Sequence, residues 1–374
     1  MSARRVGPYR LLAGALLLAI STACAGPAMA ETGVSSWFQQ LIPQRSRKTR
    51  PVAKPAAQPS VTLGRQAPVK NSRLKRVPLG KTLVVPSGED AAYIAFDQGQ
   101  YLTALRLAEA KAKQNDPQAH TLIARLYADG LGVPKDELKA AKWYRRGAEL
   151  GDIEAMFAFG VMLISGSAIK RDAVGAGQMF ERAARKGHAQ AHYNLGLLFL
   201  SGKGKPENPY RAAQHLNFAA RKGIVEAQYD LAALYQRGHG VKPDAFKAAS
   251  WLRRAAEKGL AAAQYEYAVA LLRGRGFNAD RPKAIDYLTA AADKGVAGAQ
   301  NRLAHVYALG ITGLAKNPVE AAKWRLIARG NGIKDKALDA QIAKYPKRVL
   351  AAAEAAARRF GERSLVGLGG GKAP

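Results

Sequence analysis

Between Asp116 and Gly130, apolar and polar positions follow the spacing of a helix that buries one side. The apolar or small positions are Ala119, Leu122, Ile123, Leu126 and Tyr127. Residues three or four apart share one face of an α-helix, so this spacing predicts an amphipathic helix. Gly130 fits the position after the helix end, where a left-handed backbone is best tolerated by a residue without a Cβ.

The same pattern recurs with a constant period of 36 residues. One glycine series is Gly151, Gly187, Gly223, Gly259 and Gly295, and a second is Gly130, Gly166, Gly202, Gly238, Gly274 and Gly310. Alanines keep the same step at Ala119, Ala155, Ala191, Ala227, Ala263 and Ala299. A period of this length is typical of a stacked-repeat architecture rather than of one globular core.

A second helix is predicted in each repeat, after a short loop. Helix-capping residue types recur at Asp136, Asp172, Asn208, Asp244, Asp280 and, after one inserted residue, Asn317. Their side-chain oxygens accept a backbone N–H that the first helical turn leaves unpaired. Lysines precede the next glycines at Lys186, Lys222, Lys258 and Lys294, where a cation suits the negative end of a helix. Each repeat is therefore expected to be a helical hairpin that is stable only in a stack.

These signals predict an all-α chain in which αα-hairpins form a solenoid. Residues 115–331 hold six repeats, and residues 89–114 are interpreted as a starting hairpin because Ala104 stands one period before Ala140. Residues 332–360 are expected to form two capping helices, 335–344 and 346–360, which cover the apolar face of the last repeat. Residues 361–374 are expected to be a flexible tail.

Residues 1–30 have the features of a secretory signal peptide. Three arginines, Arg4, Arg5 and Arg10, precede an apolar run over residues 11–20, and Ala28-Met29-Ala30 supplies a cleavage signal. The run is too short to span a membrane. We therefore expect cleavage after Ala30 and a periplasmic protein. A lipoprotein anchored through Cys24, the single cysteine, is the alternative, and Ser21 is a poor residue for it three places upstream.

Residues 31–88 carry eleven Lys or Arg and one acidic residue, Glu31. Apolar residues are sparse, so this segment cannot bury enough surface to fold and is predicted to be a disordered basic linker. The simplest interpretation is a solvated tether. The alternative is an electrostatic arm that contacts anionic lipid or cell-wall polymer.

Net charge narrows the class of partner. From residue 89 onward there are 44 Lys or Arg against 27 Asp or Glu, and the whole chain has a formal net charge of +30. A positive field favours acidic partners. Nucleic acid would be the usual partner of such a charge, but the export signal argues against it.

No constellation of catalytic residues is evident. His188 and His192 lie four apart and could share a metal, but no glutamate base lies between them and no third ligand is nearby. The remaining histidines form no set: His120, His215, His239 and His305. The glycine-rich loops lack the preceding strand of a phosphate-binding loop. The sequence therefore predicts a protein that is not an enzyme, with no cofactor and no metal site.

The fourth repeat carries the clearest resemblance to a known family. Its segments Ala227-Gln228-Tyr229, Gly238-His239-Gly240 and Ala255-Ala256-Glu257-Lys258-Gly259 are similar to the Sel-one-like repeat, a tetratricopeptide-like helical repeat. The resemblance covers all six units. It implies a right-handed superhelix used as a protein-binding scaffold, and in exported bacterial members often a regulator of membrane-associated partners. Some secreted relatives staple each hairpin with a disulfide, and this chain lacks those cysteines.

In stacked hairpins the first helices line the concave face, so contact residues are sought where first-helix chemistry changes between repeats. One row of equivalent positions is Asn194, Asp230, Glu266 and Arg302, and a second near the helix ends is Arg237 and Arg273. Structural repetition does not require these identities. They are candidate partner contacts, and the simpler alternative is a solvated surface. The tyrosines Tyr193, Tyr229 and Tyr265 are instead expected to pack.

The sequence thus favours a non-catalytic periplasmic scaffold or regulator that binds an acidic or membrane-associated protein on its concave face. The alternative is an envelope-associating module that binds anionic lipid or wall polymer through residues 31–88. Neither the identity of the partner nor the oligomeric state is encoded in these patterns.

Overall fold

The computed structural model describes residues 91–310 and 314–369, with side chains up to residue 362. The predicted signal peptide, the basic linker and Cys24 lie outside the described residues, as do residues 370–374. Sixteen helices, α3 to α18, make up the regular structure of the described ranges. The predicted all-α solenoid is confirmed.

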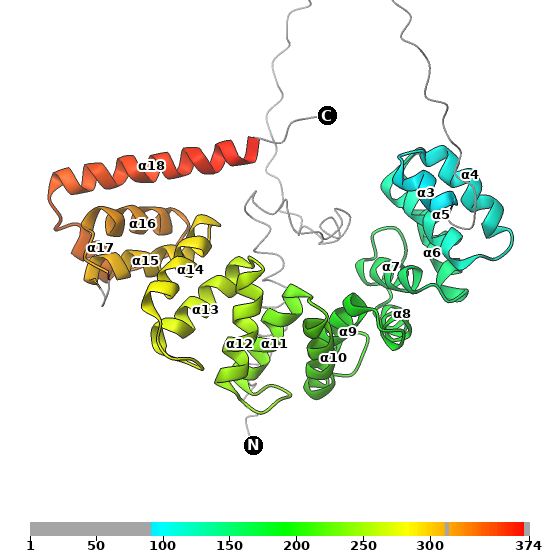
Figure 1. Ribbon diagram of the computed structural model, residues 1–374, viewed down its shortest axis with the longest axis horizontal. Coiled ribbons are helices and arrows are strands. Elements are labelled where there is room, and N and C mark those ends of the chain that lie inside the picture. The colour runs from blue at the N-terminus through cyan, green and yellow to red at the C-terminus, as the bar shows by residue number, and fades with distance from the viewer. Residues whose placement is uncertain (1–90, 311–313, 370–374) are drawn as a thin grey trace, which may run out of the picture.

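Six hairpins of two helices follow one another along an open arc (Figure 1). The first helices are α5 (Pro117–Asp129), α7 (Ile153–Ser165), α9 (Ala189–Ser201), α11 (Val225–Arg237), α13 (Ala261–Arg273) and α15 (Ala297–Leu309). The second helices are α6 (Glu137–Glu149), α8 (Ala173–Arg185), α10 (Pro209–Arg221), α12 (Ala245–Glu257), α14 (Arg281–Asp293) and α16 (Pro318–Gly330). Each of the twelve is 13 residues long, so the sequence period is the period of the structure.

The second helices begin at the predicted capping residues. Asp244, for example, has an extended backbone and accepts a hydrogen bond from the Lys247 N–H at 2.8 Å. Its five equivalents cap in the same way: Asp136, Asp172, Asn208, Asp280 and Asn317. This pairing satisfies one of the donors that every helix start exposes.

The first helices begin differently in the two halves of the array. Asp116, Asp152 and His188 cap α5, α7 and α9 through their side chains. Apolar residues occupy the equivalent position of α11, α13 and α15, and no side-chain cap forms there: Ile224, Leu260 and Val296. These three side chains pack against the core instead, so packing replaces the hydrogen bond.

A row of side chains joins four of the six first helices, α9, α11, α13 and α15, to the hairpin before them. Gln228, Gln264 and Gln300 donate their Nε2 hydrogens to the carbonyl oxygens of Ala220, Ala256 and Ala292, at 3.1, 3.3 and 3.1 Å. Nε2 of His192 lies 3.0 Å from the Ala184 carbonyl in the same position. Those carbonyls belong to the last turn of the preceding second helix, and each also accepts the backbone N–H of the glycine that follows the helix.

Packing is local along the arc, because each helix contacts mainly its neighbours in sequence. The buried positions are dominated by alanine on both helices, with leucines and aromatic residues between them. Ala212, Ala248 and Ala284 of the second helices are each at most 1% exposed. Such small residues let helices approach closely, and enlarging one is expected to cost about 1–3 kcal/mol.

Short elements close both ends of the array. At the N-terminal end α3 (Ala91–Asp97) and α4 (Tyr101–Ala112) form a hairpin that packs on α5. At the C-terminal end α17 (Lys336–Ile342) is followed by α18 (Lys347–Gly369), which lies across α16 (Figure 1). The Phe360 ring meets the Trp324 ring edge-on at 5.3 Å between centroids, so α18 covers apolar surface of the last hairpin.

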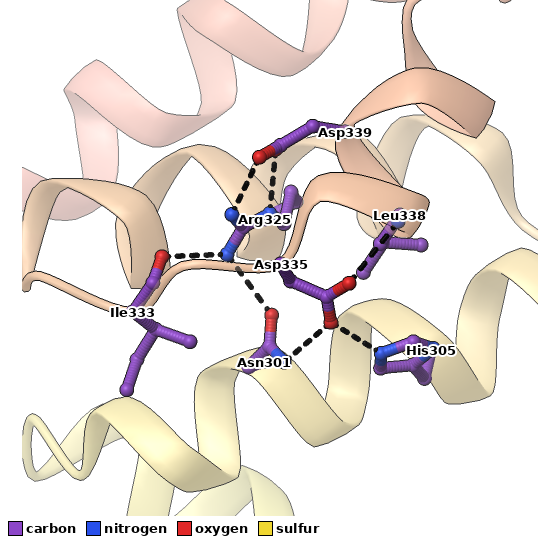
Figure 2. A network of polar contacts seen from close by, with 7 residues as sticks. All are labelled: Asn301, His305, Arg325, Ile333, Asp335, Leu338 and Asp339. Atoms are coloured by element: carbon purple, nitrogen blue, oxygen red, sulfur yellow. Dashed lines mark hydrogen bonds and ion pairs between the residues drawn. The ribbon is translucent and has the colours of Figure 1, made fainter.

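A buried guanidinium ties α17 to the last repeat (Figure 2). Arg325 of α16 is 2% exposed and donates to both carboxylate oxygens of Asp339, at 2.7 and 2.8 Å. It also donates to Oδ1 of Asn301 and to the Ile333 carbonyl. Asp335, which caps α17, accepts from Asn301 at 3.0 Å and lies 2.7 Å from Nε2 of His305. The cap is therefore held by charge as well as by apolar contact.

The chain remains helical to Gly369, nine residues past the predicted helix end at Phe360. The prediction that residues 361–374 form a flexible tail is wrong as far as Gly369. Gly361 does not stop the helix, because a glycine costs a helix only about 1 kcal/mol and no proline follows it before Gly369.

Candidate partner-binding surface

The predicted contact residues all lie on first helices. Asn194, Asp230, Glu266 and Arg302 occupy the sixth residue of α9, α11, α13 and α15, and Arg237 and Arg273 are the last residues of α11 and α13. We call the surface formed by these positions and by Tyr193, Glu226 and Tyr229 the first-helix face.

Asp230 is the most buried member of the predicted row. Its residue surface is 8% exposed, and its Oδ2 accepts a hydrogen bond from the Tyr193 hydroxyl at 3.1 Å. Burial raises the pKa of the Asp230 carboxyl to about 7, an effect that the Tyr193 bond opposes and the nearby Glu226 charge reinforces. Removing a carboxylate from water disfavours its charged form. Asp230 therefore joins two repeats and is poised between protonation states near neutral pH.

Glu266 lies near two positively charged side chains. Burial raises the pKa of its carboxyl, and the guanidinium groups of Arg237 and Arg273 oppose that rise. The same carboxyl is the largest electrostatic influence on Tyr229, whose pKa burial raises to about 12. One member of the first predicted row, Glu266, thus lies near enough to both arginines of the second row to be influenced by their charge.

Asn194 lies one period before Asp230, and Arg302 lies one period after Glu266. Both are half-buried, and neither makes a hydrogen bond or ion pair with another part of the described chain. Their polar groups are available to a partner. The first-helix face therefore offers an amide, a half-buried acid and three arginines over four successive hairpins.

Sequence reasoning missed the contact between Tyr193 and Asp230. Tyr193 packs as predicted, at 5% exposure, but its hydroxyl also binds the next repeat. The sequence signal that could have found this contact is a spacing of one period plus one residue. Residues 37 apart, one more than the period, place a first-helix tyrosine beside the varying position of the following repeat.

The histidines take structural roles. Nδ1 of His188 accepts from the Ala191 N–H at 3.0 Å, and its Nε2 lies 3.3 Å from Oε1 of Glu154. His215, for which the sequence indicates no partner, places its Nδ1 2.9 Å from Nδ1 of His192. Burial lowers the pKa of both rings, that of His215 to about 4. The two residues are 23 apart and lie on different helices, so their contact is not visible as a sequence motif.

Among the described residues, no group of three or more His, Cys, Asp or Glu is placed to hold a metal ion. In the same ranges, no helix combines the length and apolarity needed to cross a bilayer.

Comparison with known proteins identifies the repeat. The model of the Sel1 repeat matches six consecutive segments, residues 117–152, 153–188, 189–224, 225–260, 261–296 and 297–326. A search of curated proteins found no match.

Two solved structures share the fold. The crystal structure of c5321, a protective antigen present in uropathogenic Escherichia coli strains displaying an SLR fold, is 25% identical with a TM-score of 0.64. The alignment covers 74% of this chain and 61% of the antigen, so this chain spans less than two thirds of the antigen's length. A Sel1 repeat protein from Oxalobacter formigenes is 31% identical with a TM-score of 0.58, over 64% of this chain and 98% of that one.

The matched segments span more than half of the chain, and their bounds agree with the hairpins of the structure. The chain therefore belongs to the Sel1 repeat family, whose members are typically non-catalytic and generally act as scaffolds for protein–protein interaction.

Proposed function

We propose that this protein is a non-catalytic scaffold or regulator that works in the periplasm and holds an envelope protein on its first-helix face. The observation that carries the proposal is the placement of Glu266, Arg237 and Arg273 on two adjacent first helices, where both guanidinium groups oppose the rise in the pKa of the Glu266 carboxyl. Repetition of the fold does not require charges there, since other repeats place Ser165 and Ser201 at the position of the arginines.

The chemistry of these three residues favours a partner with acidic side chains. Arg237 and Arg273 are exposed, while Glu266, whose carboxyl they influence, is half-buried. A planar guanidinium can bind a carboxylate through two parallel hydrogen bonds, which gives geometry as well as attraction. The partner's carboxylates would meet the arginines, with Asn194 and Arg302 at the margins of the contact.

Site-specific crosslinking tests this proposal in intact cells. A photoreactive residue at Ala262 of α13, one helical turn before Glu266, is expected to capture a protein. One at the exposed Gln214 of α10, a second helix, is not. The double variant Arg237→Glu/Arg273→Glu should lose the captured protein. The matched variant Arg185→Glu/Arg221→Glu, at the ends of two second helices, should retain it. Equal capture by both double variants would contradict a role for the first-helix face.

The periplasmic location is part of the proposal and rests on residues 1–30. Cell fractionation should place the protein in the periplasmic fraction, and the purified protein should begin at Glu31. Cys24→Ser should leave that distribution unchanged. A shift of the wild type alone to the membrane fraction would instead support a lipid anchor at Cys24.

A second candidate function follows from the charge of residues 31–88. Eleven Lys or Arg against Glu31 would attract anionic lipid or wall polymer. Replacing the eleven with Gln in the full chain should abolish sedimentation with purified cell wall if the linker is the binding element. Protein capture at Ala262 should survive the same replacement, which separates the two functions.

A further inference from the structure

Five of the seven large apolar side chains that are exposed in the described residues occupy one position of the repeat. They are Leu102, Leu138, Val174, Tyr210 and Phe246, which follow one another at the 36-residue period. Each is the second residue of its helix, and the five helices are α4, α6, α8, α10 and α12. Scattered exposed apolar residues are normal, but a row at one repeated position is not explained by scatter.

The fold does not require these side chains to be apolar. Tyr210 is 63% exposed and Phe246 is 61% exposed, so most of each ring lies outside the core. The Phe246 ring meets the Phe277 ring of the next repeat's loop, edge-on at 5.3 Å between centroids. The second residue of these helices exposes its side chain to water, where a polar residue would be equally compatible with the helix.

Basic residues surround the aromatic end of this row. We call residues 203–211, 239–247 and 275–283 the loop edge. It contains eight Lys or Arg and three acidic residues, Glu207, Asp244 and Asp280. Six of the cations are exposed and make no ion pair with the described chain: Lys203, Arg211, Lys242, Arg275, Arg281 and Lys283. Two of the acids, Asp244 and Asp280, already bind the backbone N–H groups of Lys247 and Lys283.

A shallow cavity of about 590 Å³ opens beside the Phe246–Phe277 pair. Tyr267 and Phe277 line its apolar side, and Asp280, Arg281 and Lys283 line its charged side. Three periods earlier a second cavity of about 590 Å³ is lined by the equivalent Phe159 and Ile169, with Lys170 and Arg171 at its rim. The combination of apolar and charged lining at the loop edge thus also occurs at an equivalent place earlier in the array.

We propose that the loop edge is a docking surface for a bilayer that contains anionic lipid. Exposed Tyr and Phe set among Lys and Arg are the residue types that lie at the boundary between lipid headgroups and acyl chains. The apolar side chains project singly, one for each hairpin, and charged loops separate them. A fluid surface can accommodate each ring independently, whereas a folded protein would need apolar sites at the same fixed spacing.

In this arrangement Tyr210 and Phe246 insert among the acyl chains near the headgroups. Lys242, Arg281 and Lys283 neutralise lipid phosphates, and the cavity at Phe277 accepts one headgroup. Binding would therefore require both an anionic lipid and apolar groups at positions 210 and 246, a requirement that an apolar fluorophore at position 246 also meets. It would be independent of residues 31–88, since every residue involved belongs to the solenoid.

A fluorescent label on the loop edge separates this surface from the basic linker. In the full chain carrying Cys24→Ser, an environment-sensitive fluorophore is attached at Phe246→Cys, or at Leu309→Cys as a matched exposed apolar control. With vesicles of phosphatidylcholine and phosphatidylglycerol, the label at 246 is expected to shift to the blue, and the label at 309 is not. Neither label should shift with pure phosphatidylcholine. An unshifted label at 246 on anionic vesicles would overturn the proposal, whether or not the linker holds the protein there.

Charge-removal variants test the cations with the label still at position 246. Lys242→Gln/Arg281→Gln/Lys283→Gln should raise the lipid concentration for half-maximal shift by up to about 100-fold, since each cation near an anionic surface contributes about fivefold. The control Lys186→Gln/Lys222→Gln/Lys258→Gln removes three cations from the opposite ends of the second helices and should change it far less.

Equal effects of the two triple variants would overturn the proposal. A blue shift produced equally by soluble poly-glutamate would also overturn it, in favour of an acidic polypeptide. Far-ultraviolet circular dichroism melting of each variant checks that the solenoid remains folded.

Discussion

Asp230 shows how a single residue can make this fold sensitive to pH. Its carboxyl is 8% exposed, and burial raises its pKa to about 7 from an ordinary value of 3.8. A raised folded-state pKa means that the neutral acid is favoured in the fold. The resulting stability is fully present below the unfolded pKa and is lost as pH rises through the folded pKa.

We therefore expect the Asp230→Asn variant to change the pH profile of stability. Relative to this variant, the free energy of unfolding of the wild type should fall by roughly 3–4 kcal/mol between pH 4 and pH 8. Asparagine can still accept the Tyr193 hydroxyl hydrogen. Urea denaturation across that range measures the difference, with the exposed Asp286→Asn as control. Parallel profiles for wild type and Asp230→Asn would show that the buried carboxyl does not titrate in this window.

Two glycines with similar backbones differ in what surrounds them. Gly223 has φ +92 with nothing within 4 Å of an added Cβ, whereas at Gly240, φ +72, the added atom would overlap the Pro209 backbone carbonyl. Gly223→Ala is expected to cost about 1–2 kcal/mol through left-handed strain alone. Gly240→Ala should cost about 1–3 kcal/mol more, because the neighbouring loop must move. Thermal unfolding of the two variants checks this order, and the reverse order would mean that the loop adjusts freely.

At the scale of elements, the repeat period is what makes the helices predictable from the sequence. Glycine and Asp or Asn mark where helices end and begin, because few residue types satisfy those backbone positions. Contacts between helices are harder to predict from the sequence. The Tyr193–Asp230 bond and the His192–His215 pair cross between helices, and their partners do not share a position in the period.

The exposed apolar row is present in the sequence but cannot be distinguished there from a core. Leu138, Val174, Tyr210 and Phe246 keep the period while differing in size, and periodic apolar residues are ordinarily assigned to a core. Only exposure separates a buried row from an exposed one. The helix beyond Phe360 was not predicted because Gly361 suggests a helix end, although a single glycine costs a helix little.

The glutamines that join successive hairpins are expected to differ in how much each contributes to stability. Gln300 donates to the Ala292 carbonyl and its Oε1 accepts from Asn331, whereas Oε1 of Gln264 is buried without a partner in the described chain. Gln300→Met is therefore expected to cost about 2 kcal/mol. Gln264→Met should cost less than about 1 kcal/mol, because it also removes an unpaired buried oxygen. Chemical denaturation of both variants measures the difference, and equal losses would contradict the assigned contacts.

At the scale of the whole molecule, stability is distributed along the arc, since each hairpin contacts mainly its neighbours. The C-terminal cap depends on the buried Arg325 and its bond to Asp339. Asp339→Ala leaves that guanidinium with only the Asn301 and Ile333 oxygens and is expected to cost roughly 2–4 kcal/mol.

That loss should be confined to one end. Amide hydrogen exchange in Asp339→Ala is expected to accelerate in α15 to α18 and to remain unchanged in α5 to α8. The exposed Asp286→Ala, on α14, provides a comparison that leaves the cap intact. Uniform acceleration over all sixteen described helices would mean that the array unfolds as one cooperative unit.

The identical length of the twelve repeat helices makes the unit interchangeable. A tandem copy of residues 225–260 would present, at each new junction, the same glutamine, glycine and capping aspartate that its neighbours already accept. The protein should therefore tolerate the insertion of a whole repeat inside the array. A seven-hairpin chain would keep both closing elements, lengthen the row of first-helix tyrosines by one and unfold at a higher temperature. The length of the array can therefore change in evolution by one whole repeat at a time.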